Sequence, residues 1–223
     1  MSDTQQEQTP TQNPSEGVKL KGLFAFKEGM STIYNDLGEA VPVTILRYDP
    51  WYVSQVKTQE SDGYEAVQIA RLSEKKKGNK ASLGHLKSAN VKSSNMVREF
   101  RHAGSSEVSV GQLVAIETLV KGDLVKITAR SKGKGFQGSV RRWSFAGGPA
   151  SHGSKFHRQP GSSGNRTWPG RVMPGKKFPG HLGDETVTVR NVEIVEVLPA
   201  ENVLMVRGPV PGGRNTLVKL VRE

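Results

Sequence analysis

The sequence predicts a mainly β protein, in which a barrel of short antiparallel strands carries one long, extended, glycine-rich and basic loop. Two observations predict this class. Short runs of β-branched, aromatic and alternating apolar residues recur along the chain between turn signals. One stretch, residues 131–183, holds 12 of the 25 glycines and 5 of the 12 prolines, and so interrupts the strands.

Four strands are expected after an N-terminal tail. Residues 1–17 are rich in Gln, Thr, Ser, Pro and Glu, and are predicted to be disordered. The runs LKGLFAF, AVPVTILRY, WYVSQVKT and YEAVQIAR then have strand character, and NDLG, DP and SDG are turn signals between them. We expect these four runs to belong to an antiparallel sheet or barrel.

Residues 72–104 form a polar segment of different character. Two weakly helical patches predict a small, partly helical insertion on the rim of the barrel, with one or two short helices. The segment also contains a cationic cluster, Lys75, Lys76, Lys77 and Lys80. We interpret this cluster as a solvated loop, with a contact surface as the alternative.

Strands resume in LVAIETLV (113–120) and DLVKITAR (123–130), and return in three runs after residue 185, with LPAEN as a hairpin signal. The predicted domains are a tail (1–17), a β-barrel domain (18–130 and 182–223) and an extended segment, residues 131–181, which we call the arm. Within 137–181 only ten positions are Ala, Val, Met, Phe or Trp, too few for a core. We therefore expect the arm to gain its order from a partner.

Composition excludes several classes of protein. The 223 residues include no cysteine, which rules out disulfides and thiolate metal sites. No apolar run approaches the roughly 20 residues that a membrane helix needs. The N-terminus has neither the basic-then-apolar pattern of a secretory signal nor an Arg-rich transit peptide. A cytoplasmic protein without a membrane partner is expected.

The positive charge is concentrated in one segment. Residues 124–183 contain twelve lysines and arginines and no acidic residue, whereas the whole chain has a net charge of +11. A solvated charged face usually mixes both signs. A one-sided segment of this kind is typical of a surface that binds a polyanion, because each cation placed on a phosphate releases counterions.

A glycine motif at the start of the arm offers an alternative to polyanion binding, namely a nucleotide-binding loop. Gly133, Gly135 and Gly138, with Val140, match G-x-G-x-x-G-x-V, a pattern shared by dinucleotide-binding turns and kinase glycine-rich loops. We expect no helix after it, since SVRRWSFAGGP lacks a helical apolar period. The next acidic residue is Asp184, too far on to hold a ribose, and no kinase or P-loop motif follows. A nucleotide site is disfavoured.

The histidines and serines predict neither a metal site nor catalysis. His152 and His157 are five residues apart, with His181 far downstream, and zinc sites need further Cys or His at tight spacing. Ser151 beside His152 has no acid in its segment, so no general acid–base pair is available. We expect no metal, no cofactor and no enzymatic activity.

The arm instead alternates cations with flat rings. Rings and guanidinium planes stack on unpaired bases, while cations and backbone N–H groups bind phosphates. The alternative for Trp143 and Trp168 is that either ring packs back on the barrel. The candidate RNA-binding residues are Lys132, Lys134, Arg141, Arg142, Trp143, His152, Lys155, His157, Arg158, Arg166, Trp168, Arg171, Lys176 and Lys177. DNA is disfavoured as the polyanion, since a groove reader needs a rigid helix or two-stranded ribbon and neither is expected in the arm.

From about residue 21 to residue 223, the chain resembles the bacterial type of the large-subunit ribosomal protein L-three family. The matching segments are very specific in combination. They are KEGMSTIYNDLGEAVPVTIL, Gly84-His85, EFR at 99–101, VKITARSKGKGFQGSVRRW, SHG at 151–153, PGSSG at 160–164, PGRVMPGKKFPGHLG at 169–183 and VRGPVPG at 206–212.

The resemblance implies a split β-barrel of the translation-protein type at the surface of the large ribosomal subunit, with the long loop entering the rRNA. It implies direct binding to large-subunit (23S-type) rRNA, a role in nucleating subunit assembly, and a loop that approaches the peptidyl transferase region. It also implies neighbouring ribosomal proteins of the families numbered fourteen and nineteen. The family is not itself a catalyst.

Two positions depart from the family. Some bacterial members carry a methylated glutamine shortly before the pair that is here Pro169-Gly170, but Thr167 stands at that position, so the modification is not carried over. Trp168 is bulkier than the residue common there, so the family's local conformation at the tip is not carried over either.

Overall fold

The structure is a computed structural model that describes residues 17–73, 78–89, 91, 93–101 and 108–222. The chain divides into two compact units. We call the first, Met1–Ala129 with Val187–Glu223, the barrel unit, and the second, Arg130–Thr186, the arm unit. Residues 1–16 of the predicted disordered tail, and Lys75, Lys76 and Lys77 of the cationic cluster, lie outside the described residues.

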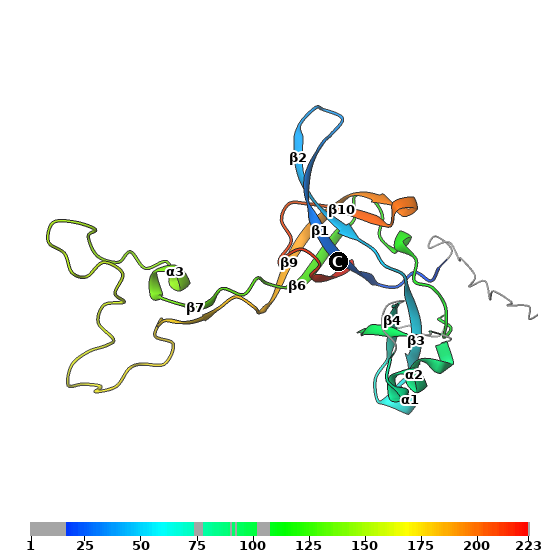
Figure 1. Cartoon of the computed structure of the whole chain (residues 1–223), viewed down its shortest axis with the longest axis horizontal. Coiled ribbons are helices and arrows are strands. Elements are labelled where there is room, and N and C mark those ends of the chain that lie inside the picture. The colour runs from blue at the N-terminus through cyan, green and yellow to red at the C-terminus, as the bar shows by residue number, and fades with distance from the viewer. Residues whose placement is uncertain (1–16, 74–77, 90, 92, 102–107, 223) are drawn as a thin grey trace, which may run out of the picture. The chain divides into compact units, whose positions relative to one another are not determined.

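A closed barrel of six strands organises the first unit (Figure 1). Inward positions such as Val125, Ile127 and Ala129 are buried, and they alternate with Lys126 and Thr128, as the two-residue period of a strand requires. Around the barrel the order is β1 (Gly22–Tyr34), β11 (Leu217–Arg222), β6 (Leu124–Arg130), β9 (Thr186–Leu198), β10 (Val203–Arg207) and β2 (Ala40–Arg47). The prediction of a mainly β, barrel-type fold is confirmed.

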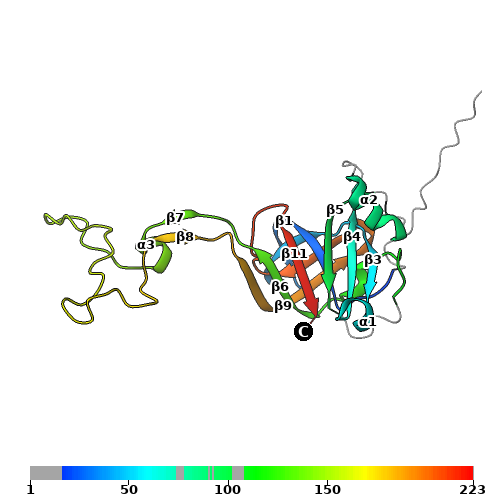
Figure 2. The same ribbon diagram turned by 90° about the horizontal axis from the view of Figure 1, so that it is seen from below.

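A separate three-stranded sheet forms the rest of the barrel unit (Figure 2). It contains β3 (Trp51–Lys57), β4 (Ala66–Leu72) and β5 (Ser94–Phe100). The shared core joins sheet and barrel, because the Phe24 ring lies 5.5 Å from that of Trp51 and 4.7 Å from that of Phe100. The short helices are α1 (Gln59–Asp62), α2 (Lys80–Leu86) and η1 (Lys87–Ala89).

Two expectations about strands differ from the structure. Strand β5 was not predicted, because its side chains are mostly half-exposed and polar, which conceals the alternation. The prediction of a strand at residues 113–120 was wrong. Its backbone bonds to different segments, Val114 N to Trp51 O and Ala115 N to Val18 O, and then enters the 3-10 helix η3 (Ile116–Thr118). The predicted hairpin at LPAEN is present, with η4 (Pro199–Glu201) joining β9 to β10.

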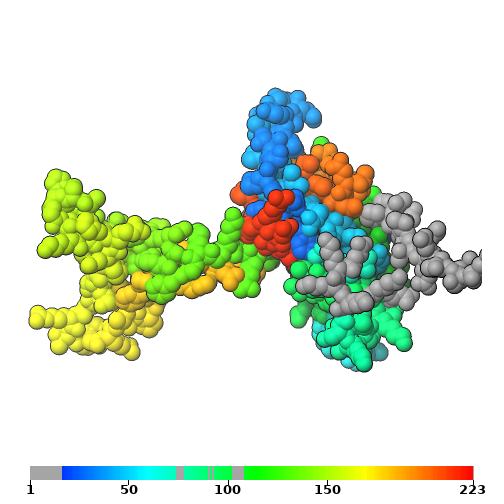
Figure 3. All heavy atoms as spheres, viewed as in Figure 1, coloured from blue at the N-terminus to red at the C-terminus, as the bar shows by residue number. Residues whose placement is uncertain are grey.

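The paired ends of β1 and β2 continue beyond the barrel as a hairpin. β1 pairs with β11 only over Gly22–Phe26, and β2 pairs with β10 only over Val43–Arg47. In the described pairings, residues 32–41 therefore pair only within the hairpin, whereas Pro42 O at its base accepts a 2.8 Å hydrogen bond from Gly208 N. The hairpin is uncovered on the face seen in Figure 3.

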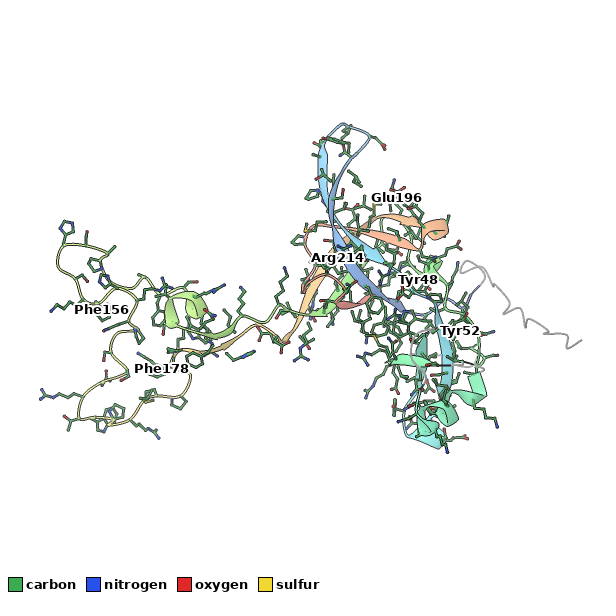
Figure 4. The ribbon with its side chains drawn as sticks, in the orientation of Figure 1. Tyr48, Tyr52, Phe156, Phe178, Glu196 and Arg214 are labelled. Atoms are coloured by element: carbon green, nitrogen blue, oxygen red, sulfur yellow. The ribbon has the colours of Figure 1, made fainter. Side chains whose placement is uncertain are left out.

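Tyr48 provides a test of how the barrel unit is held together (Figure 4). Its buried hydroxyl donates a 2.5 Å hydrogen bond to Val114 O, and burial raises the pKa of this phenol. We expect Tyr48→Phe to lower the free energy of unfolding by about 1–3 kcal/mol, because the carbonyl loses its partner. The measurement is urea unfolding of the purified chain.

Tyr52 is the matched control. In the part of the chain that is described, its hydroxyl has no hydrogen-bond partner, so Tyr52→Phe is expected to change the free energy of unfolding by less than about 0.5 kcal/mol. Equal effects of the two substitutions would contradict the role given to the bond from Tyr48.

Candidate nucleic-acid interface

The arm unit begins as a two-stranded ribbon. Ser131 N bonds to Glu185 O at 2.8 Å and Lys134 N to Leu182 O at 2.9 Å. β7 (Gly135–Gln137) then pairs with β8 (Gly180–Leu182). This ribbon corrects the expectation that the arm lacks one. The extended backbone on each side of the arm satisfies its hydrogen bonds with the other side, which local sequence does not reveal.

Two features hold the two strands of the ribbon together. Gly183 has φ +73°, and a Cβ there would lie 3.1 Å from Lys132 C and 3.3 Å from Gly133 Cα and would overlap Lys132 O, so only glycine fits. The exposed Arg130 guanidinium donates to Asp184 twice, Nε to Oδ1 at 2.5 Å and Nη2 to Oδ2 at 2.9 Å. These bonds lower the pKa of the Asp184 carboxyl and keep it charged.

A short helix follows the ribbon, where none was expected. α3 (Ser139–Trp143) is five residues long and starts directly after Gly138. The prediction from SVRRWSFAGGP was wrong because a single turn is too short for an apolar period, and this turn is held by contacts from residues 35 positions away.

Those contacts converge on one carbonyl, Phe178 O. Arg142 Nη1 and Trp143 Nε1 each donate to it at 2.9 Å. The Arg142 guanidinium also lies 4.9 Å from the Trp143 ring centroid, and Lys177 Nζ lies 5.6 Å from it. Gly180 lies directly beside them, and a Cβ there would displace the Arg142 guanidinium. We call Arg142, Trp143, Lys177 and Phe178 the arm clasp.

The distal part of the arm is a series of turns. Gly148 N bonds to His157 O at 2.7 Å, and turns close at Ser154, Gln159 and Lys176. His152 and His157 have φ values of 59° and 38°, and their rings are exposed. Within the described arm unit, Ser139 is the only side chain that is buried, so this unit has no apolar core.

The glycine motif does not form a phosphate cradle. Lys134 N is bonded to Leu182 O, and Gly135 and Gln137 pair with β8, so these backbone groups are used within the ribbon. In a phosphate loop the corresponding N–H groups point at the ligand. The described residues also contain no group of three His, Cys, Asp or Glu side chains that could hold a metal.

The predicted site residues fall into two sets. Arg142, Trp143 and Lys177 are brought together in the arm clasp, and Arg141 lies 3.4 Å from Gln137 Oε1. The others are exposed, and their side chains make no hydrogen bond or ion pair within the described residues, so the structure does not bring them together. They are Lys132, Lys134, His152, Lys155, His157, Arg158, Arg166, Trp168, Arg171 and Lys176.

The arm differs from the rest of the chain in how many ion pairs it makes. Eight ion pairs are found among the described residues, and only Arg130–Asp184 lies in the arm unit. The exposed arm cations without a carboxylate partner in the described residues are therefore nine: Lys132, Lys134, Arg141, Lys155, Arg158, Arg166, Arg171, Lys176 and Lys177. Unpaired cations of this kind are typical of surfaces that bind polyanions.

Sequence reasoning missed three exposed apolar side chains on the arm. Phe136 is 77% exposed, Met173 53% and Val172 49%, and Trp168, which was predicted, reaches 86%. The Trp143 indole contacts Arg142, Lys177 and Phe178 of the arm unit itself. The signal for the missed residues was available, since any large apolar side chain in a segment without a core must stay exposed.

Comparison with known proteins gives consistent matches. The family described as ribosomal protein L3 matches residues 68–199. A large ribosomal subunit protein uL3 of Bdellovibrio bacteriovorus is 68% identical over 219 residues, which covers 97% of this chain and 99% of the relative. Proteins of the same name from Desulfotalea psychrophila and Geobacter metallireducens are 44% and 45% identical, over 91% and 90% of this chain and 98% and 96% of theirs.

Proposed function

Because the chain belongs to the ribosomal protein L3 family, whose members are structural, non-enzymatic proteins of the large ribosomal subunit, we propose that its arm binds large-subunit (23S-type) rRNA directly. One observation carries the proposal. Nine exposed lysines and arginines of the arm have no carboxylate partner in the described residues, in a segment with no acidic side chain between Asp123 and Asp184. An rRNA backbone supplies the missing negative charge.

The two sets of arm residues have different roles in this proposal. The exposed cations bind phosphates, and Trp168 and Phe136 offer ring faces for unpaired bases. Arg142 and Trp143 act mainly through the arm clasp, which holds the two sides of the arm together at Phe178 O. The paired strands β7 and β8 have only three residue pairs, and helix α3 has only five residues. Both are too short to read a DNA groove.

The resemblance extends the proposal to assembly and to the place of the protein in the subunit. The protein nucleates large-subunit assembly, its loop approaches the peptidyl transferase region, and its neighbours include ribosomal proteins of the families numbered fourteen and nineteen. Its compartment is the cytoplasm. No helix among the described residues has the length and apolar character to span a membrane.

A single substitution tests the phosphate role. The Arg158 side chain is exposed and makes no hydrogen bond or ion pair within the described residues, so Arg158→Ala is expected to leave the arm intact. The slope of log binding constant against log salt concentration should fall by about 0.7–0.9, the value of one phosphate contact. The measurement is filter binding of the purified chain to large-subunit rRNA between about 50 and 400 mM salt.

Lys121 serves as the matched control, since it is an exposed lysine of the barrel unit in the turn before β6. Lys121→Ala removes the same charge and is expected to leave the slope unchanged. An unchanged slope for Arg158→Ala, or equal changes for both variants, would contradict a phosphate contact at Arg158.

A further inference from the structure

The hairpin of β1 and β2 differs in charge from the rest of this basic protein. From Glu28 to Leu46 the chain has no lysine or arginine, although its net charge is +11. Glu28 lies at the base of the hairpin, where Arg47 Nη1 is 3.0 Å and Arg214 Nη2 2.5 Å from its carboxylate oxygens. Asp36 and Glu39 remain at the tip, and no cation of the described residues pairs with them.

One face of the hairpin is neutral and exposed. Cross-strand partners share a face, and the pairs Thr32↔Pro42 and Tyr34↔Ala40 alternate with Ile33↔Val41. Met30 belongs to the same face by the two-residue period and is 53% exposed, while Tyr34 is 74% exposed. Leu37, in the turn, is 84% exposed. Apolar side chains gathered on a projecting element mark an interaction site more often than isolated ones do.

The turn that carries these side chains is held in one conformation. Asn35 Oδ1 accepts hydrogen bonds from Leu37 N at 3.1 Å and Glu39 N at 2.8 Å, and Asn35 Nδ2 donates to Glu39 Oε2 at 2.9 Å. Gly38 supplies the left-handed residue with φ +78°. A preorganised tip loses little conformational freedom when a partner covers it.

We propose that the tip of this hairpin, residues 30–42, docks on a basic protein of the same large subunit and not on rRNA. The inference rests on the proposed function, because that function places the protein in the large subunit, where such a partner is present. An apolar centre with a charged rim is the usual anatomy of a protein interface. The two rim carboxylates repel phosphates but complement lysines and arginines, so the charge selects a basic protein as the occupant.

Photocrosslinking in native large subunits tests the inference. A benzophenone side chain replaces Tyr34 in one strain and Phe136 in a second, and purified subunits are irradiated. Position 34 is expected to crosslink to a ribosomal protein, identified by peptide mass, at a segment with excess Lys and Arg. Position 136 reports on the proposed function and is expected to crosslink to rRNA.

The outcomes separate the two claims. A crosslink from position 34 to rRNA, to an acidic or neutral protein segment, or to nothing overturns the docking inference. It leaves the proposed function standing if position 136 still crosslinks to rRNA. If position 136 fails to reach rRNA, the proposed function fails instead.

Charge reversal gives a second readout on the same crosslink. Asp36→Lys with Glu39→Lys is expected to lower the protein crosslink yield from position 34 by about tenfold or more, because like charges then face each other. Glu60→Lys with Glu65→Lys makes the same change in net charge at other exposed acids of the barrel unit and should leave the yield unchanged. Equal yields from both reversal variants would overturn the basic character of the partner.

Discussion

Replacing Lys155, Arg158, Arg166 and Arg171 together with glutamine is expected to weaken binding to large-subunit rRNA on the order of 10³-fold at about 0.1 M salt. Each phosphate contact contributes roughly 0.7–0.9 to the salt slope, so four lost contacts remove about three orders of magnitude at that salt concentration. All four side chains are exposed and have no partner in the described residues, so the arm should keep its conformation. Filter binding across a salt series measures the effect.

A second quadruple variant tests whether the loss of affinity depends on the position of the removed charges or only on their number. Lys19, Lys21, Lys87 and Lys121 are exposed lysines of the barrel unit, and their replacement with glutamine removes the same charge. This control is expected to weaken binding less than about tenfold, through the long-range field alone. If the two variants lose affinity equally, binding depends on net charge and the arm has no special role.

The second large effect is expected from Gly183→Val at the ribbon. The left-handed backbone and the overlap with Lys132 O together should destabilise the pairing of the ribbon by at least about 2 kcal/mol. Hydrogen exchange at Lys134 N, which bonds to Leu182 O, should then accelerate by about 30-fold or more. Exchange in the buried barrel strands should not change.

Gly175→Val is the control for the backbone conformation alone. Gly175 has a similar φ of +79°, but a Cβ there meets nothing within 4 Å. Exchange at Lys134 N should stay within about threefold of the unmodified chain. Acceleration by both variants alike would show that the close approach of Gly183 to Lys132 does not hold the ribbon.

The barrel could be predicted from the sequence because its strands carry the signal themselves. Alternation such as that of Val125, Ile127 and Ala129 sets the buried face, and turn residues set the ends. The separate sheet could not be deduced in this way. Its strands β3 and β4 have the same local pattern as barrel strands, and only the contacts of Phe24 with Trp51 and Phe100 show where they pack.

The arm could be predicted as a charged segment but not as a structure. Its charge and glycine content are properties of composition, whereas the clasp depends on Phe178 O accepting from residues 35 and 36 positions earlier. Arg142 and Trp143 were thus grouped with the free cations and rings although they contact the arm itself. The prediction that the remaining residues touch RNA stays a prediction.

A crosslinking map between this protein and its RNA in native large subunits tests the central claim most directly. If the account is correct, ultraviolet crosslinks to rRNA concentrate in residues 131–181, above all at exposed Trp168, Lys155 and Arg158, and are lacking in residues 30–42. A map in which rRNA crosslinks lie on the barrel unit while residues 131–181 contact no RNA would contradict it.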